Sequence, residues 1–433
     1  MATESPTIVR AIDERTLLAV AVALLILEGY DLAALGVTLP SMLADSAFGL
    51  STAGGGIAGA VTALGMLAGA ALSGILSHRV GPRRLLVAAA IVLPLGMLVC
   101  AAAPAAGVFI AARALVGIGM GMVPPTLLAL VTDLSEAGRR ARNVGIAMAG
   151  IAVGGLSAPL LGAALLPETS FRWIYVIGAI PALGAIPFVV RLLPESPVHL
   201  VRTGRAEDAA RLTSAMGIPY PTLGEDLGPR GLGLRTLFRP GLGIVTVLFW
   251  LMAACALLLV FGVTAWLPTI MQTAGFELGS ALLLTAVVAI GAGVGMVVGG
   301  RVADAVGPKL VTVVAFASGA ASLVLIAQGP PLWALLPLML VCGFGLNGTQ
   351  ALINAFVLAR YPADVRGTGL SWTLAVGRAG AILGPVLGAA VLSSGLAVQW
   401  NFYAFAVVGV SGAVLALCVP ASRDYASRAA DSR

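Results

Sequence analysis

Twelve long apolar stretches occupy most of this chain of 433 residues, from about residue 16 to about residue 420. Each is near the roughly 20 residues that an α-helix needs to cross the hydrocarbon core of a bilayer. Only 10% of the residues are charged and 59% are hydrophobic, whereas a soluble domain carries about 25% charged residues. We therefore expect an all-α, multi-pass membrane protein with no room for a soluble catalytic domain.

The basic residues predict the topology. All but three of the 25 Lys and Arg residues lie on the tails or in loops after even-numbered stretches. Such loops stay cytoplasmic, so we expect both termini to be cytoplasmic and the first stretch to be retained. This distribution also explains the net charge of +6 without a nucleic-acid partner. Lys309 is the single lysine beside 24 arginines, which is typical of a GC-rich bacterial genome and suggests the bacterial cytoplasmic (inner) membrane.

The chain divides into two halves of six stretches. We expect a first bundle over 1–193, a cytoplasmic linker with a short amphipathic helix over 194–241, a second bundle over 242–420 and a cytoplasmic tail over 421–433. The halves repeat with an offset of 226, which relates GILSHRVGPRR at 74–84 to GRVADAVGPKL at 300–310. Repeated transporters of this kind hold their substrate near the bilayer midplane, between the halves.

Four charged residues lie inside apolar stretches: Glu28, Asp31, Arg113 and Arg378. Charged groups at membrane depth are costly and mark functional sites. None of the four has a charged counterpart 226 positions away in the other half. We therefore interpret them as requirements of a substrate site rather than of the repeated fold.

Several motifs resemble a known group of transporters. The two loops of the repeat and RALVGIGMG at 113–121 are similar to motifs of the major facilitator superfamily. Within it, the chain resembles the aromatic acid:proton symporter family over nearly its whole length, through EGYD at 28–31, WLPT at 266–269, NGTQALIN at 347–354, YPADVRGTG at 361–369 and GRAGAILGP at 377–385. It departs from that family at Glu28 and His78, where Asp is usual, and at Asp133, where Glu is common. The change at His78 puts the usual ion-pair network of that loop in doubt.

The resemblance implies a proton site on the first span. Glu28 and Asp31 are three residues apart and share one helix face, so we expect them to titrate as a unit. We favour Asp31 as the group that exchanges the proton, because the resemblance puts it on the most constrained position. The alternative is that both carboxylates sit at a helix end and reach water.

Arg378 is the best candidate for binding a carboxylate. It lies about eleven residues into its span, near midplane, and a guanidinium matches a carboxylate in bidentate fashion. The alternative is a permanent ion pair with Glu28 or Asp31. The resemblance implies that Arg113 lines the cavity of the first half and contacts the acids of the first span.

Polar and aromatic side chains complete the expected substrate site. Asn347, Gln350 and Asn354 share one face of the tenth span and could bind ring hydroxyls, or could simply hydrogen-bond between helices. We also expect Tyr30, Trp266 and Trp372 to stack on an aromatic substrate, although Trp266 could be an interface anchor. A second group belongs to a cytoplasmic gate: His78, Arg79, Gly81, Arg83, Arg84, Asp133, Asp304, Gly307, Lys309 and Arg366.

These features favour uptake of an aromatic carboxylate with a proton by a monomer that uses no other cofactor. Alternatives are proton-driven efflux of drugs or metabolites, uptake of another organic anion or a sugar, and a non-transporting sensor. An enzyme has no support, because no nucleophile–base or metal-ligand pattern is present. The four cysteines lack metal or redox spacing, and RALVGIGMG follows no strand, so it is not a dinucleotide-binding motif.

Overall fold

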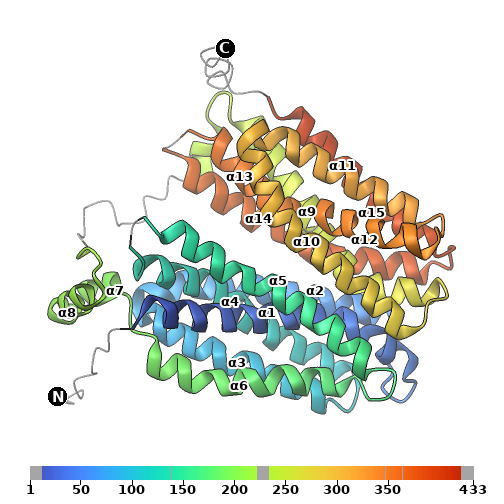
Figure 1. Ribbon diagram of the computed structural model, residues 1–433, viewed down its shortest axis with the longest axis horizontal. Helices are drawn as coiled ribbons and strands as arrows, with labels where there is room; N and C mark the ends of the chain where they lie inside the picture. The colour runs from blue at the N-terminus through green and yellow to red at the C-terminus, as the bar shows by residue number, and fades with distance from the viewer. Residues whose placement is uncertain (1–11, 137, 222–233, 347, 363, 421–433) are drawn as a thin grey trace.

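A computed structural model describes residues 12–136, 138–221, 234–346, 348–362 and 364–420. Within these residues, twelve helical segments are long and apolar enough to cross a membrane, and no strand is present. The predicted all-α membrane fold is therefore confirmed. Figure 1 shows two helical bundles lying side by side, the first in blue to green and the second in yellow to red.

The first bundle contains α1 (Glu14–Ala44), α2 (Thr52–Val80), α3 (Pro82–Ala102), α4 (Ala106–Asp133), α5 (Arg140–Leu165) and α6 (Arg172–Leu192). The connection to the second bundle carries α7 (Pro197–Arg202), the amphipathic α8 (Ala206–Met216) and a short 3-10 helix, η2 (Leu234–Phe238). The second bundle contains α9 (Gly243–Thr273), α10 (Leu278–Val306), α11 (Pro308–Ile326), α12 (Leu332–Leu346), α13 (Thr349–Arg360), α14 (Arg366–Ser393) and α15 (Gln399–Cys418).

The helix boundaries reproduce the sequence repeat. The four pairs α2 and α10, α3 and α11, α4 and α12, and α5 and α14 each begin 226 residues apart. The matching turns have matching backbones as well, since Gly81 has φ 91° and Gly307 has φ 94°. Glycine adopts such positive φ values without steric cost, and the proline that follows each glycine suits the first position of a helix. The expected pair of pseudo-symmetric six-span bundles is thus confirmed.

One span is interrupted. The tenth apolar stretch consists of α12 and α13, which are separated at Gly348. The Gly348 N–H donates to the carbonyl of Gly343, five residues earlier, instead of continuing the α-helical pattern. A Cβ on Gly348 would lie 3.0 Å from Cα of Gly295 on α10. Small residues let helix backbones approach this closely within a membrane.

The two bundles meet at the end remote from the chain termini. There Gly36 of α1 packs on the Thr264 carbonyl of α9 with no room for a Cβ, and a Cβ on Gly59 of α2 would lie 2.5 Å from Cβ of Pro385 on α14. Trp266 of α9 is completely buried at this contact. In Figure 1 the ribbons of the two bundles diverge toward the end that carries α7 and α8. Backbone-to-backbone packing therefore closes one end of the space between the bundles.

Candidate substrate and proton site

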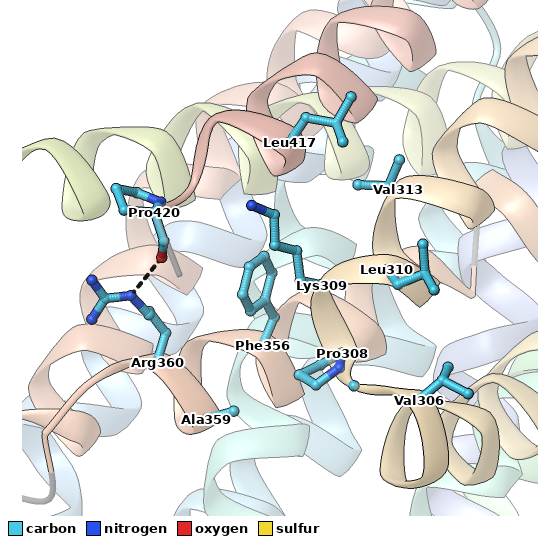
Figure 2. A pocket seen from close by; sticks show the side chains of 11 residues that line it. Val306, Pro308, Lys309, Leu310, Val313, Phe356, Ala359, Arg360, Leu417 and Pro420 are labelled. Carbon is cyan, nitrogen blue, oxygen red and sulfur yellow. Dashed lines mark hydrogen bonds between the residues drawn. The ribbon is translucent and has the colours of Figure 1, made fainter. Parts of the chain in front are cut away.

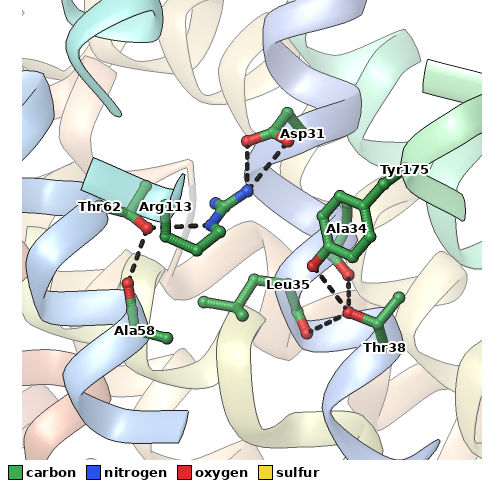
Figure 3. Close-up of polar contacts among 8 residues, drawn as sticks. All are labelled: Asp31, Ala34, Leu35, Thr38, Ala58, Thr62, Arg113 and Tyr175. Atoms are coloured by element: carbon green, nitrogen blue, oxygen red, sulfur yellow. Dashed lines mark hydrogen bonds and ion pairs between the residues drawn. The ribbon is translucent and has the colours of Figure 1, made fainter. Parts of the chain in front are cut away.

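An ion pair lies inside the first bundle. Nη1 of Arg113 on α4 is 2.8 Å from Oδ2 and 3.0 Å from Oδ1 of Asp31 on α1. Nε of Arg113 donates to the hydroxyl of Thr62 on α2 at 3.1 Å, and that hydroxyl donates to the Ala58 carbonyl (Figure 3). Arg113 is 1% exposed and Asp31 is not exposed at all. Because charge-assisted hydrogen bonds offset the loss of hydration, these three residues tie α1, α2 and α4 together.

Two tyrosines next to this ion pair use their hydroxyls inside the first bundle. The Tyr30 hydroxyl donates to the Ile174 carbonyl of α6 at 2.7 Å, and its ring is buried. The Tyr175 hydroxyl lies 2.9 Å from that of Thr38 (Figure 3). The structure thus places Tyr30, which we expect to stack on a substrate, between α1 and α6.

Glu28 differs from Asp31, although it lies one helical turn away. Its side chain is buried, with 5% exposed, and its Oε2 has no hydrogen-bond partner among the described residues. Arg378 is the basic residue that interacts with it electrostatically. A buried carboxylate without full hydrogen bonding is costly when ionised, so protonation of Glu28 would relieve that cost.

Arg378 lies on α14 in the second bundle and is half-buried. Its one polar contact within the described residues is with Sδ of Met66 on α2, at 4.0 Å from Nη1. A thioether is a weak acceptor, so most of the donors of this guanidinium stay available. Arg378 therefore reaches across to the first bundle without forming the permanent ion pair that would neutralise it.

A small cavity of about 20 Å³ connects the ion pair to the boundary between the bundles. Thr62 and Arg113 contribute from the first bundle, and Phe261 and Pro385 from the second. A space of this size holds about one water molecule. Arg113 thus contacts Asp31 inside the first bundle and also lines the cavity at the interface between the bundles.

The remaining candidates for substrate contact are spread over the second bundle. Nε2 of Gln350 donates to Oδ1 of Asn354 at 3.1 Å along α13, while Asn347 lies outside the described residues. Nε1 of Trp266 donates to the Pro385 carbonyl at 2.8 Å, inside the contact that closes the bundles. Trp372 is 38% exposed and packs on Trp250, with 6.2 Å between ring centroids.

The predicted gate residues lie near the end of the bundles that carries the termini. Arg83 donates from Nη2 to the Val190 carbonyl at 2.6 Å, and Lys309 donates from Nζ to the Val419 carbonyl at 2.6 Å. Asp133 accepts from the Ser196 hydroxyl at 2.5 Å. Gly81 and Gly307 form the matching turns with positive φ, and the side chain of His78 lies outside the part of the chain that the structure describes. Four others are exposed: Arg79, Arg84, Asp304 and Arg366.

Four residues that contact the site or the gate are not predicted by the sequence. Thr62 and Met66 contact the two arginines, whereas Glu195 and Ser196 contact the gate. Thr62 gave a weak signal, as a hydroxyl inside an apolar stretch. Glu195 and Ser196 lie in the PESP segment at 194–197, but nothing in the sequence places Glu195 beside the turn at Gly81. Among the described residues, no group of three or more His, Cys, Asp or Glu side chains is placed to hold a metal ion.

Comparison with known proteins identifies the family. Residues 21–385, and again 279–432, match the Major Facilitator Superfamily. The chain belongs to this superfamily. It is 32% identical to a gentisate transporter of Corynebacterium glutamicum over 91% of this chain and 84% of the relative. It is 29% identical to a benzoate transport protein of Acinetobacter baylyi, over 93% and 88%, and 29% identical to a gallate transporter of Pseudomonas putida, over 92% and 89%.

Solved structures support the same fold for this major facilitator protein. A D-xylose-proton symporter matches with a TM-score of 0.75 and 20% identity, over 94% of this chain and 98% of the other. The xylose transporter of E. coli in an inward-open conformation matches with a TM-score of 0.74 and 18% identity, over 95% and 97%. The resemblance to aromatic acid symporters is also confirmed, because the curated relatives named above are transporters of aromatic acids.

Proposed function

We propose that this chain is a monomeric, proton-coupled symporter that takes up a small aromatic carboxylate across a bacterial cytoplasmic membrane, with both termini cytoplasmic. The names of the curated relatives support the substrate class. The observation that carries the proposal is the contrast between two membrane-embedded arginines. Asp31 neutralises Arg113 at 2.8 Å, whereas Arg378 contacts only a thioether in the described structure.

The substrate carboxylate pairs with Arg378 in this proposal. A planar guanidinium offers two parallel donors to a carboxylate, and Arg378 has these donors free. A lipophilic cation, the substrate expected of many drug-efflux antiporters, would instead be repelled here. The aromatic ring then lies along the boundary between the bundles, where Phe261 of α9 lines the small cavity beside Arg113.

Charge balance at the site explains the coupling to a proton. When Asp31 and Glu28 are ionised, their two negative charges balance the two positive charges of Arg113 and Arg378. A bound carboxylate adds one negative charge, which is costly in a desolvated site. Protonation of one acid restores neutrality, so carboxylate and proton cross together. This requires no cofactor and no covalent chemistry.

The contacts favour Glu28 over Asp31 as the group that exchanges the proton, which reverses the preference drawn from the resemblance. Asp31 uses both oxygens on Arg113, so its protonation would leave a buried guanidinium unpaired. Glu28 has an oxygen without a partner and lies within the electrostatic reach of Arg378. When the substrate occupies Arg378, Glu28 loses that favourable interaction and takes up a proton.

Alternating access follows from the packing between the bundles. If the termini are cytoplasmic, then the contact through Gly36, Gly59 and Trp266 lies on the outer side. The structure would then correspond to the inward-facing state. Opening to the outside requires these contacts to separate, while the opposite ends of the two bundles come together.

Uptake by proteoliposomes tests the coupling. Vesicles containing the purified protein should accumulate radiolabelled gentisate or benzoate when the outer solution is acidic, because the proton gradient then points inward. A protonophore should abolish the accumulation. Glu28→Gln protein should lose concentrative uptake and keep exchange between labelled and unlabelled substrate, since exchange requires no net proton movement. Accumulation that survives the protonophore in wild type would exclude proton symport.

A further inference from the structure

A second cavity, of about 310 Å³, lies in the second bundle at the end that carries the termini. It opens among α10, α11, α13 and α15 (Figures 1 and 2), and Arg378 does not line it. Among the described residues, Lys309 and Arg360 are the charged side chains that line it, and no acidic side chain does. Most of the rest of the lining is apolar, and includes Leu310, Phe356 and Leu417.

Both cations keep donors available in this cavity. Nζ of Lys309 donates to the Val419 carbonyl at 2.6 Å, and Nε of Arg360 donates to the Pro420 carbonyl at 3.0 Å (Figure 2). An ammonium has three donors and a guanidinium has five, so each has more to offer an anion. The amino end of α11, at Pro308, also lines the cavity, and a helix amino end favours negative charge.

The internal repeat shows what the cavity lacks. At the matching place in the first bundle, Oε1 of Glu195 accepts the Arg83 N–H at the start of α3, at 3.1 Å. A Cβ on Gly81 would lie 2.5 Å from Oε2 of Glu195, whereas a Cβ on Gly307 would have no described atom within 4 Å. The offset of 226 puts Ala421 opposite Glu195 in the sequence. The first bundle thus supplies its own anion at this turn, whereas the described residues of the second bundle supply none and the sequence has alanine at the matching position.

The rim of the cavity indicates which kind of anion could pair with Lys309 and Arg360. Val306, Leu310 and Leu417 are 55%, 56% and 58% exposed, and lie on helices that span the membrane. Apolar side chains exposed on such helices face acyl chains. Basic pockets between membrane helices near the headgroup region bind anionic lipids. We propose that this cavity binds the phosphate of an anionic phospholipid, with Lys309 and Arg360 on the phosphate and an acyl chain along Leu310 and Leu417.

Native mass spectrometry of the full-length protein in detergent tests this site. Phosphatidylglycerol should bind wild type more tightly than phosphatidylcholine does. Lys309→Gln and Arg360→Gln should each weaken phosphatidylglycerol binding about fivefold and together about 25-fold, from the typical contribution of one basic residue near a membrane surface. Lys309→Arg should retain the binding. Arg301→Gln is the matched control, because Arg301 is exposed near this end of α10 but does not line the cavity.

Three results would overturn the proposal. The first is wild-type protein that binds the two lipids equally, and the second is a double variant with wild-type affinity for phosphatidylglycerol. The third concerns the tail, whose carboxylates Asp424 and Asp431 are the other candidate anions. If the tail filled the cavity, the full-length variant Asp424→Asn/Asp431→Asn would bind phosphatidylglycerol at least fivefold more tightly. Thermal unfolding of each variant checks that it is folded.

Discussion

At the scale of single residues, the two buried acids of α1 differ in the hydrogen bonds that their carboxylates accept. Asp31 accepts two hydrogen bonds from Arg113, whereas one oxygen of Glu28 has no hydrogen-bond partner in the described part of the chain. A buried ion pair is strongly destabilised when one partner is removed, because the other charge is left uncompensated. These contacts support the proposal that Asp31 is chiefly structural and that Glu28 exchanges the proton, although the two residues lie one turn apart.

Substitution of the two acids separates these roles. Asp31→Asn should lower the free energy of unfolding by about 3–5 kcal/mol, because Arg113 then lies buried without a counter-charge. Glu28→Gln should change stability by less than about 1 kcal/mol, since the lost oxygen has no partner to leave unsatisfied. Denaturant titration of both variants in detergent measures the difference. The double variant Asp31→Asn/Arg113→Gln should recover part of the loss, and equal destabilisation by the two single variants would contradict the assignment.

The sequence identified the charged residues of the site but not their pairing. Glu28, Asp31, Arg113 and Arg378 stand out because charge is rare inside apolar stretches. Which acid meets which arginine depends on how α1, α4 and α14 are rotated and how far apart they lie. A sequence pattern contains neither quantity. The contacts of Thr62 with Arg113 and of Met66 with Arg378 were not predicted for the same reason. Neither residue type is unusual in an apolar stretch, so only its neighbour in the structure shows its role.

At the scale of helices, glycines control how closely elements pack. The apolar stretches and the repeat predicted the helices well, because a membrane-crossing helix must be long and apolar. The interruption at Gly348 was not predicted, since it depends on the close approach of Gly295 from α10. Likewise, nothing in the sequence marks Gly36 and Gly59 as contacts between bundles rather than within one.

A bulky residue at Gly59 should weaken the contact between the bundles. In Gly59→Leu the new side chain would clash with Pro385, so the population should shift toward the state that is open at this end. Spin labels at Ala47 and Gln272, which are exposed in opposite bundles at this end, should show longer distances by pulsed electron resonance. Gly184→Leu is the matched control, because a Cβ there would have no described atom within 4 Å. Unchanged label distances in Gly59→Leu would contradict the role of this contact.

At the scale of the whole molecule, the repeat explains both the architecture and its asymmetries. The bundles share helix boundaries and turn geometry at an offset of 226, and this was readable from the sequence. The candidate functional residues lie where the two halves of the repeat differ. At the offset of 226, Asp31 and Arg113 have no charged counterparts in the second half of the sequence, Arg378 has none in the first, and Glu195 corresponds to Ala421. The relative placement of the bundles was not predictable, because it changes during alternating access.

Binding of benzoate to Arg378→Lys protein tests most directly whether Arg378 captures the substrate carboxylate. Lysine keeps the charge but cannot supply two parallel donors. Loss of a charge-assisted bond in a desolvated site costs roughly 2–5 kcal/mol, so affinity measured by calorimetry should fall about 30-fold to several-thousand-fold. Benzamide, which lacks the carboxylate, should bind weakly to both proteins and serves as the control. Wild-type affinity for benzoate in folded Arg378→Lys protein would contradict bidentate capture of the carboxylate by Arg378.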